Sequence, residues 1–291
     1  MRTAREFVNL FACLVHEKPD VIWDMVSNLR YLDPASYVLL YNNSDDLTLL
    51  EDARFHSDAH VLVHPDPQKH RYGTLHGYMI DCMEWACQNM EFDTITNVDS
   101  DQLLLHPGYT QCLTRIMEQN PNLGMLQSSP ATPLWPSILP DSFGNRRFLA
   151  HPQRTALTEF GNWRPFLSKC EGALDRFPLW TFWPGTTFSR QACCALLGLL
   201  ESSLLLRAII RRSRMFATEE IILPTLVDVL GFDLVRTPFD EACLCFKVAY
   251  TEDTLRESLS VPDRFWMHPI PRDLDNPLRA YLREHHQLYQ G

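Results

Sequence analysis

Through the first half of this chain, short apolar segments alternate with longer amphipathic ones, and this alternation restricts the fold more than any other feature. A strand, a helix and a second strand in succession close as a right-handed crossover that leaves the two strands parallel. We therefore expect an α/β fold with a mostly parallel sheet flanked by helices. The expected strands are 9–15, 37–41, 61–63 and 92–98, and the expected helices begin at Pro19 or cover about 75–89 and 108–118.

The second half of the chain is less regular. Residues 128–178 are rich in proline and aromatic residues and show little periodicity, which predicts a long binding loop or lid. No linker divides the chain, so we expect one domain over residues 1–291 that carries this segment as an insertion. After the insertion we expect strands at 179–188 and 242–248, helices from Arg190 and from Glu219, and a terminal helix at 276–287.

Charge and cysteine content restrict the partners and the compartment. The 291 residues hold 26 lysines and arginines against 36 aspartates and glutamates, a net charge of −10, which argues against a nucleic-acid partner. The nine cysteines form no CxxC pair, and no signal peptide is apparent, so we expect a cytoplasmic protein.

The most apolar window, 193–210, predicts a buried helix rather than a membrane span, because Glu201 and Arg207 interrupt it. The arginines that follow leave peripheral contact with a membrane open; they are Arg207, Arg211, Arg212 and Arg214.

Polar side chains follow several of the expected strands. In parallel α/β sheets, ligands bind at the carboxyl ends of the strands, where His16, Asn42 and Asp99-Ser100-Asp101 are expected. Two carboxylates two residues apart on extended chain project to the same side and can hold a divalent cation such as Mn²⁺ or Mg²⁺. The alternative for Asp99 and Asp101 is a solvated turn.

Three further residues are candidates for chemistry. Glu219 and Glu220 stand at an expected helix start, where a carboxylate can accept a proton from a hydroxyl or simply complement the helix dipole. His268 can be a metal ligand or a satisfied structural histidine. The chain lacks GxGxxG, GxxxxGK[ST], GxSxG and HExxH motifs, which argues against dinucleotide oxidoreductases, P-loop kinases, α/β-hydrolases and zincins.

Four segments, taken in order, resemble a GT-A type glycosyltransferase, and in particular the family of core-2 β-1,6-N-acetylglucosaminyltransferases and peptide O-xylosyltransferases. The segments are 11–19 (FACLVHEKP), 71–75 (RYGTL), 182–190 (FWPGTTFSR) and 219–226 (EEIILPTL). The resemblance implies a GT-A like, Rossmann-like fold and inverting transfer of a sugar from a nucleoside diphosphate sugar, with UDP as the expected nucleotide. It also implies that Glu220 is the general base and that Glu219 fills the acidic position before it.

The same resemblance implies a nucleotide-sugar donor and a glycan, lipid-linked or small-molecule acceptor. Residues 1–127 would bind the donor and 179–291 the acceptor. The 128–178 segment does not match the family, but sugar and lipid faces stack on aromatic rings, so Trp135 and Trp163 are candidates for an acceptor platform or for part of a lid packed on the core. Mn²⁺ or Mg²⁺ would be held by Asp99, Asp101 and His268. The expected donor-binding residues are His16, Asn42, Tyr72, Asp99 and Gly185.

Two other functions stay open. A sugar-nucleotidyltransferase has a similar nucleotide-binding half, but its glycine-rich basic loop is not supplied by His16-Glu17-Lys18-Pro19. A non-catalytic carbohydrate- or nucleotide-sugar-binding protein would bind the donor without turning it over.

Overall fold

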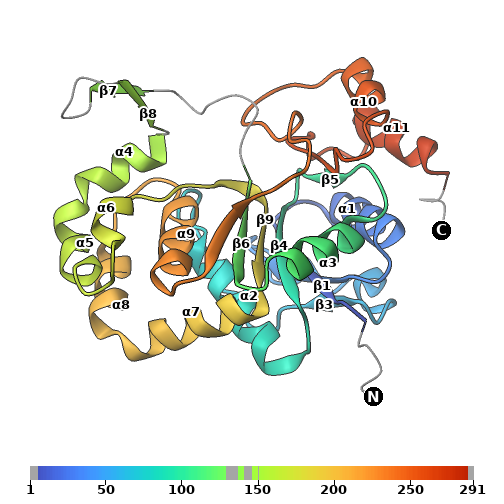
Figure 1. Ribbon diagram of the computed structural model, residues 1–291. Helices are drawn as coiled ribbons and strands as arrows, with labels where there is room; N and C mark the ends of the chain where they lie inside the picture. The colour runs from blue at the N-terminus through green and yellow to red at the C-terminus, as the bar shows by residue number, and fades with distance from the viewer. Residues whose placement is uncertain (1–5, 129–136, 141–145, 150, 288–291) are drawn as a thin grey trace.

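The computed structural model describes residues 6–128, 137–140, 146–149 and 151–287, and its centre is a seven-stranded sheet (Figure 1). The strand order is β10-β6-β9-β4-β1-β2-β3, and all neighbours are parallel except β9, which runs antiparallel to both β4 and β6. The expected α/β class with a mostly parallel sheet is confirmed. The sheet strands are β1 (Asn9–Val15), β2 (Tyr37–Asn42), β3 (Val61–Val63), β4 (Thr94–Asp99), β6 (Leu123–Ser128), β9 (Phe182–Ser189) and β10 (Asp233–Arg236).

Helices cover both faces of the sheet, so its central strands are apolar on both sides. Along β1, Phe11, Cys13 and Val15 face one core and Leu10, Ala12 and Leu14 face the other. The first core is closed by α1 (Pro19–Leu32) and α3 (Tyr109–Gln119), and the second by α2 (His76–Asn89), α7 (Arg190–Ser202), α8 (Leu204–Arg212) and α9 (Glu219–Val229).

The antiparallel strand β9 is joined to the sheet by polar as well as apolar contacts. Thr96 on β4 lies 2.9 Å from Thr187 on β9 (Oγ1 to Oγ1) and donates a hydrogen bond to Asn9 on β1. All three side chains are buried, and buried polar groups are stable only when they are paired. These bonds therefore fix the register across the centre of the sheet.

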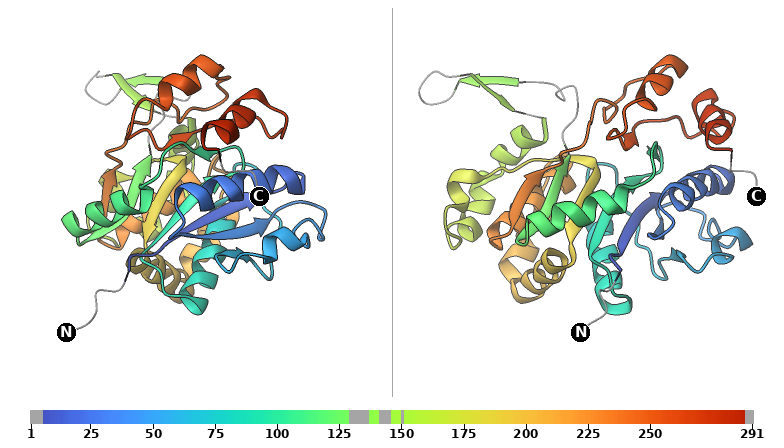
Figure 2. Two further views of the ribbon diagram at one scale, coloured as in Figure 1. Left: turned by 90° about the vertical axis from the view of Figure 1, so that its right-hand side faces the viewer. Right: turned by 45° about the vertical axis from the view of Figure 1, so that its right-hand side comes forward.

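The C-terminal segment, orange to red in Figures 1 and 2, lies over one end of the sheet. It contains α10 (Glu252–Ser258), β11 (Trp266–Met267) and α11 (Pro277–His285), and β11 pairs antiparallel with β5 (Leu103–Leu104). The fully buried Arg279 on α11 donates to Asp24 on α1, with Nη1 2.7 Å from Oδ2. This pair anchors the C-terminal segment to the first helix.

Two elements differ from expectation. Residues 128–178 are not irregular throughout, because they include β7 (Ser137–Pro140), β8 (Arg146–Leu149), α4 (His151–Thr158), α5 (Phe160–Leu167) and α6 (Ala173–Arg176). The strand expected at 242–248 is absent apart from a single bridge between Leu244 and His268, and the chain forms β10 earlier instead. A short 3₁₀ helix, η1 (Ala53–His56), precedes β3.

Of the two tryptophans expected to form a platform, the structure describes one. Trp163 is fully buried and stacks on Phe177 with ring centroids 5.6 Å apart, so it belongs to the core as the lid alternative requires. Trp135 lies outside the described residues.

Within the described ranges, no single helix combines the length and apolar character needed to cross a membrane. The pair α7 and α8, bent by 95° around Ser203, meets the same criterion when the two helices are taken together.

Gly124 provides a test of the packing between β6 and α9. A Cβ added at Gly124 would stand 2.4 Å from Cβ of Phe232 and 2.6 Å from Cγ1 of Val227, and neither atom is the free end of a flexible chain. We expect Gly124→Ala to destabilise the protein by about 2–4 kcal/mol in urea denaturation. Gly198→Ala is the control, since a Cβ there meets nothing within 4 Å; it should be neutral or slightly stabilising. An unchanged stability of Gly124→Ala would contradict this close approach of α9 to β6.

Candidate metal and substrate site

A cavity of about 710 Å³ opens at the carboxyl ends of the parallel strands, where the strand order predicts a ligand site. It is large enough for a nucleotide-sized ligand. Seven of the residues singled out in the sequence line it: His16, Tyr72, Asp99, Asp101, Glu219, Glu220 and His268.

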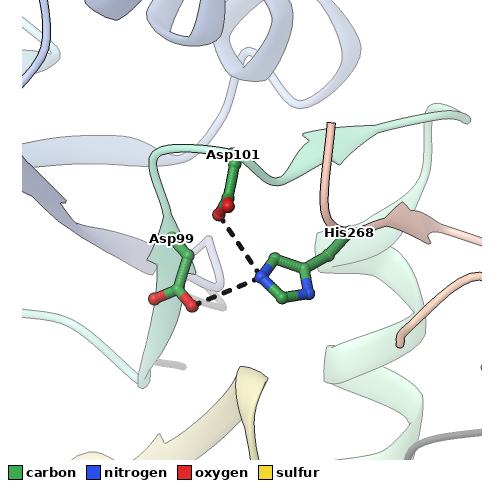
Figure 3. Close-up of side chains that lie close together, drawn as sticks. All are labelled: Asp99, Asp101 and His268. Atoms are coloured by element: carbon green, nitrogen blue, oxygen red, sulfur yellow. Dashed lines mark ion pairs between the residues drawn. The ribbon is translucent and has the colours of Figure 1, made fainter. Parts of the chain in front are cut away.

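Asp99, Asp101 and His268 form a compact group in this cavity (Figure 3). The Nε2 atom of His268 lies 3.3 Å from Oδ1 of Asp101 and 3.6 Å from Oδ2 of Asp99. One ligand atom from each residue falls within 4.8 Å of the others, which is a spacing that a single cation can bridge. The residue expected from the far end of the chain therefore does meet the two aspartates.

The backbone explains why His268 reaches this position. Because β5 follows Asp101 directly and pairs with β11, the chain after β11 returns beside the two aspartates. The amide of Ile270 donates to the carbonyl of Asp101, and the amide of His268 donates to that of Cys243. The imidazole is oriented in turn, since Nδ1 lies 2.8 Å from the carbonyl oxygen of Cys245, which leaves Nε2 facing the carboxylates.

The electrostatics of the group fit a bound cation. Oδ1 of Asp101 is buried and has no hydrogen-bond partner among the described residues, although it points at the imidazole. When Nδ1 of a neutral His268 donates to a carbonyl, Nε2 carries a lone pair that faces two carboxylates. The lone pair and the carboxylates repel one another, and a metal ion or a proton between them removes the repulsion. Burial raises the pKa of Asp99; burial disfavours the charged form of His268, but the two carboxylates outweigh it and raise the pKa of His268. These three residues could hold a divalent ion.

Arg272 joins this group to the loop after β1. Its Nε lies 2.8 Å from Oε1 of Glu17 and 2.9 Å from Oγ of Ser100, and its Nη1 lies 3.1 Å from Oδ2 of Asp101. Arg272 thus partly neutralises the acidic group. Burial alone would raise the pKa of Asp101, but His268 and Arg272 outweigh it and lower that pKa.

Glu219 and Glu220 lie at the amino end of α9 and are almost fully buried. Oε2 of Glu219 accepts from the amide of Leu75, and Oε2 of Glu220 accepts from Nε1 of Trp180, both at 2.8 Å. Burial raises the pKa of Glu219 to about 7, and burial with the neighbouring Glu219 raises the pKa of Glu220 well above its usual range. The environment of Glu220 therefore favours its protonated form more than the ordinary glutamate pKa assumed from the sequence.

Two of the predicted donor-binding residues do not line the cavity. The side chain of Asn42 accepts from the amide of Ser44 and donates to the carbonyl of Asp46, so it shapes the loop after β2. Gly185 packs near Gln102 and Trp266, and its positive φ of 75° suits a glycine.

Sequence reasoning missed the basic residues of the cavity. Lys69, Lys247 and Arg272 all line it, from three separate loops. Arg272 follows His268 by four residues, and its closeness to a predicted metal ligand was a usable signal. Lys69 and Lys247 carried no comparable signal, since neither stands in a motif.

Comparisons with known proteins correct the expected family. No family model matches the chain, and no curated protein matches it. A solved structure of 4-diphosphocytidyl-2C-methyl-D-erythritol synthase is similar over 88% of this chain and 99% of its own, with 15% sequence identity and a TM-score of 0.42. A likeness this distant carries no argument about activity.

The assignment to the core-2 β-1,6-N-acetylglucosaminyltransferase and peptide O-xylosyltransferase family, and the glycosyltransferase function that followed from it, are wrong by these comparisons. The four segments that carried the resemblance are short and loosely matched, and segments of this kind arise from the strand-loop-helix pattern of many α/β sheets. The roles assigned through the family, including the general-base role of Glu220, are withdrawn with it.

The metal group can be tested directly. We expect Asp101→Asn to weaken Mn²⁺ binding about 100-fold or more in isothermal titration calorimetry, because it removes a charged ligand from a buried group. Asp253→Asn, on the exposed surface of α10, is the matched control and should bind Mn²⁺ as the native protein does. Equal affinities for all three proteins would mean that the cation is held elsewhere.

The raised pKa of Glu219 predicts a pH-dependent stability. In the folded protein Glu219 keeps its proton up to a pH of about 7, whereas in the unfolded chain it loses the proton near an ordinary pKa of about 4.3. The free energy of unfolding therefore decreases as the pH rises from about 4.3 to about 7. Glu219→Gln removes the titration and keeps an oxygen for the amide of Leu75. We expect the variant to gain about 2–3 kcal/mol relative to the native protein between pH 5 and pH 8 in urea denaturation. The exposed Glu118→Gln is the control, and a gain independent of pH would contradict the assignment.

Proposed function

We propose that this protein is a divalent-cation-dependent nucleotidyltransferase, an enzyme that transfers a nucleotidyl group from a nucleoside triphosphate to a sugar phosphate or a similar phosphorylated acceptor. The observation that carries the proposal is the convergence, in one cavity, of the group Asp99, Asp101 and His268 with three cations, Lys69, Lys247 and Arg272. Products of this class are nucleotide sugars or related nucleoside diphosphate compounds.

The charge of the cavity suits a polyphosphate. Arginine and lysine are the side chains that bind phosphate oxygens most strongly, and a cation at the acidic group would add to them. The missing glycine-rich basic loop after β1 weighed against this function in the sequence. Lys69 comes instead from the loop before α2, Lys247 from the loop before α10 and Arg272 from the segment after β11. Lys69 pairs with Asp45, and Arg272 with Glu17 and Asp101, so a phosphate would share these cations with the carboxylates around them.

A Mg²⁺ or Mn²⁺ ion held by Asp99, Asp101 and His268 would neutralise negative charge on the phosphate oxygens. In the proposed reaction an acceptor phosphate oxygen attacks the α-phosphorus of the triphosphate, the bond from that phosphorus to the bridging oxygen breaks, and pyrophosphate leaves. We assign Arg272 the stabilisation of the negative charge that builds up on the departing group, and Lys69 the orientation of the phosphates, because both side chains line the cavity.

Glu219 and Glu220 suit a binding role in this reaction. A phosphate nucleophile is already ionised at neutral pH, so the reaction needs no base to remove a proton from it. Burial raises the pKa of Glu220, and in its protonated form this carboxyl group can donate a hydrogen bond, for example to a hydroxyl oxygen of a ribose or sugar in the cavity.

The test is an assay for pyrophosphate release with each of the four nucleoside triphosphates, a panel of sugar 1-phosphates and Mg²⁺ or Mn²⁺. The reverse reaction, formation of a triphosphate from pyrophosphate and a nucleotide sugar, extends the search when the acceptor is unknown. We expect turnover that requires the divalent cation. Release of a nucleoside diphosphate from a nucleotide sugar, or tight nucleotide binding with no turnover, would overturn the proposal.

Lysine and arginine variants test the phosphate contacts. We expect Lys69→Met and Arg272→Met each to lower kcat/KM about 10- to 100-fold, the effect of one charge-assisted hydrogen bond. Lys169→Met removes an exposed lysine remote from the cavity and should keep native kinetics. Native kinetics in both cavity variants would show that these cations do not contact the substrate.

A further inference from the structure

The helix α8 presents a surface in which exposed leucines adjoin exposed arginines. Leu204 is 75% exposed and Leu205 36% exposed, although both stand on a helix whose Leu206 and Ile209 are buried in the core. With Arg211, Arg212 and Arg214 they form what we call the α8 surface. In Figure 1 this helix lies at the lower left edge of the molecule, and none of its residues lines the cavity described above.

Helical spacing pairs each leucine with an arginine. Leu204 and Arg211 are seven residues apart and lie along one stripe of the helix, opposite the buried Leu206 and Ile209. Leu205 and Arg212 lie along a second stripe, about a quarter-turn around the helix from the first. Nη1 of Arg207 donates to the carbonyl of Leu200 at 2.7 Å and also to that of Glu201, so this side chain bridges the bend between α7 and α8.

The local charge of this segment is opposite in sign to that of the protein. The chain carries a net charge of −10, yet residues 204–214 hold four arginines and no aspartate or glutamate. Across the described part of the chain, the side chains of Arg211, Arg212 and Arg214 take part in no ion pair. Arg164, exposed on α5, lies on the helix that packs against α8 and extends the basic region.

We propose that the α8 surface binds the anionic face of a phospholipid bilayer, with Leu204 and Leu205 inserted among the lipid headgroups and the arginines paired with lipid phosphates and carboxylates. Basic residues gain affinity from an anionic leaflet, and inserted apolar side chains add to it. A nucleic acid would be attracted by the arginines but would leave two exposed leucines without a role, so the observations favour the bilayer.

The test is co-sedimentation of the whole protein with phosphatidylcholine vesicles, with and without about 30 mol% phosphatidylserine. We expect binding only to the anionic vesicles and a decrease on raising the salt concentration, since salt screens the charges. The double variant Arg211→Gln/Arg212→Gln should lower the partition coefficient about 30-fold. Leu204→Ser/Leu205→Ser should lower it about tenfold or more.

Matched controls separate this surface from general effects. Leu47→Ser removes a leucine that is 85% exposed on another loop, and Arg115→Gln removes an exposed arginine on α3; both should bind as the native protein does. No binding to anionic vesicles, or equal binding by the native protein and both double variants, would overturn the proposal. So would binding to a single-stranded oligonucleotide that the arginine variant loses and the leucine variant keeps. Because the nucleotidyltransferase assay contains no lipid, either proposal can fail without the other.

Discussion

The short pairing of β5 with β11 brings the C-terminal segment to the two aspartates of the candidate site. Leu103 and Leu104 align with Met267 and Trp266, and the other edge of β5 is occupied by Asn28 of α1, which both donates to and accepts from the backbone of Leu104. A two-stranded ribbon is marginal by itself, so its position depends on this buried amide and on the surrounding core. The pairing of this ribbon brings Asp101 and His268 side by side. It therefore also determines where these two charged groups lie in the cavity.

The fold was largely readable from the sequence where one physical signal dominated. β1, β2, the start of α1 and the bounds of α2 were predicted to within a residue or two, because buried parallel strands are continuous apolar runs and helices carry a periodic apolar stripe. The segment 128–178 was misjudged because its helices are short and because α5 contains Pro165. The late strand near 242–248 failed for a different reason. Its apolar residues pack against β5 and β11 as irregular chain, so burial alone did not make a strand.

The candidate site was readable only in part. Asp99 and Asp101 were identified because they follow a buried strand. His268 was identified because the imidazole of a histidine can be a metal ligand. Their meeting was not derivable from the sequence, since it depends on a β5–β11 pairing of two residues on each side. The pKa of Glu220 was misjudged for a similar reason: its burial beside Glu219 is a tertiary property, and an isolated glutamate gives no sign of it. Local motif matches suggested a family that the comparisons do not support, which shows how readily short segments of an α/β sheet imitate one another.

The position of β9 has a consequence for how this chain is made. In the sheet, β6 lies between β9 and β10, both of which come later in the sequence. When Ser128 has left the ribosome, β6 is complete but has no strand to pair with. Its first partner, β9, is complete only when Ser189 has also left the ribosome. At ordinary rates of synthesis that interval is about 3–12 s. During it the backbone groups of Leu123–Ser128 are unpaired and its leucines and methionine are exposed, the state in which nascent strands associate with one another. Between these strands the chain builds the helices α4, α5 and α6, so β6 stays unpaired for as long as that lobe takes to be synthesised.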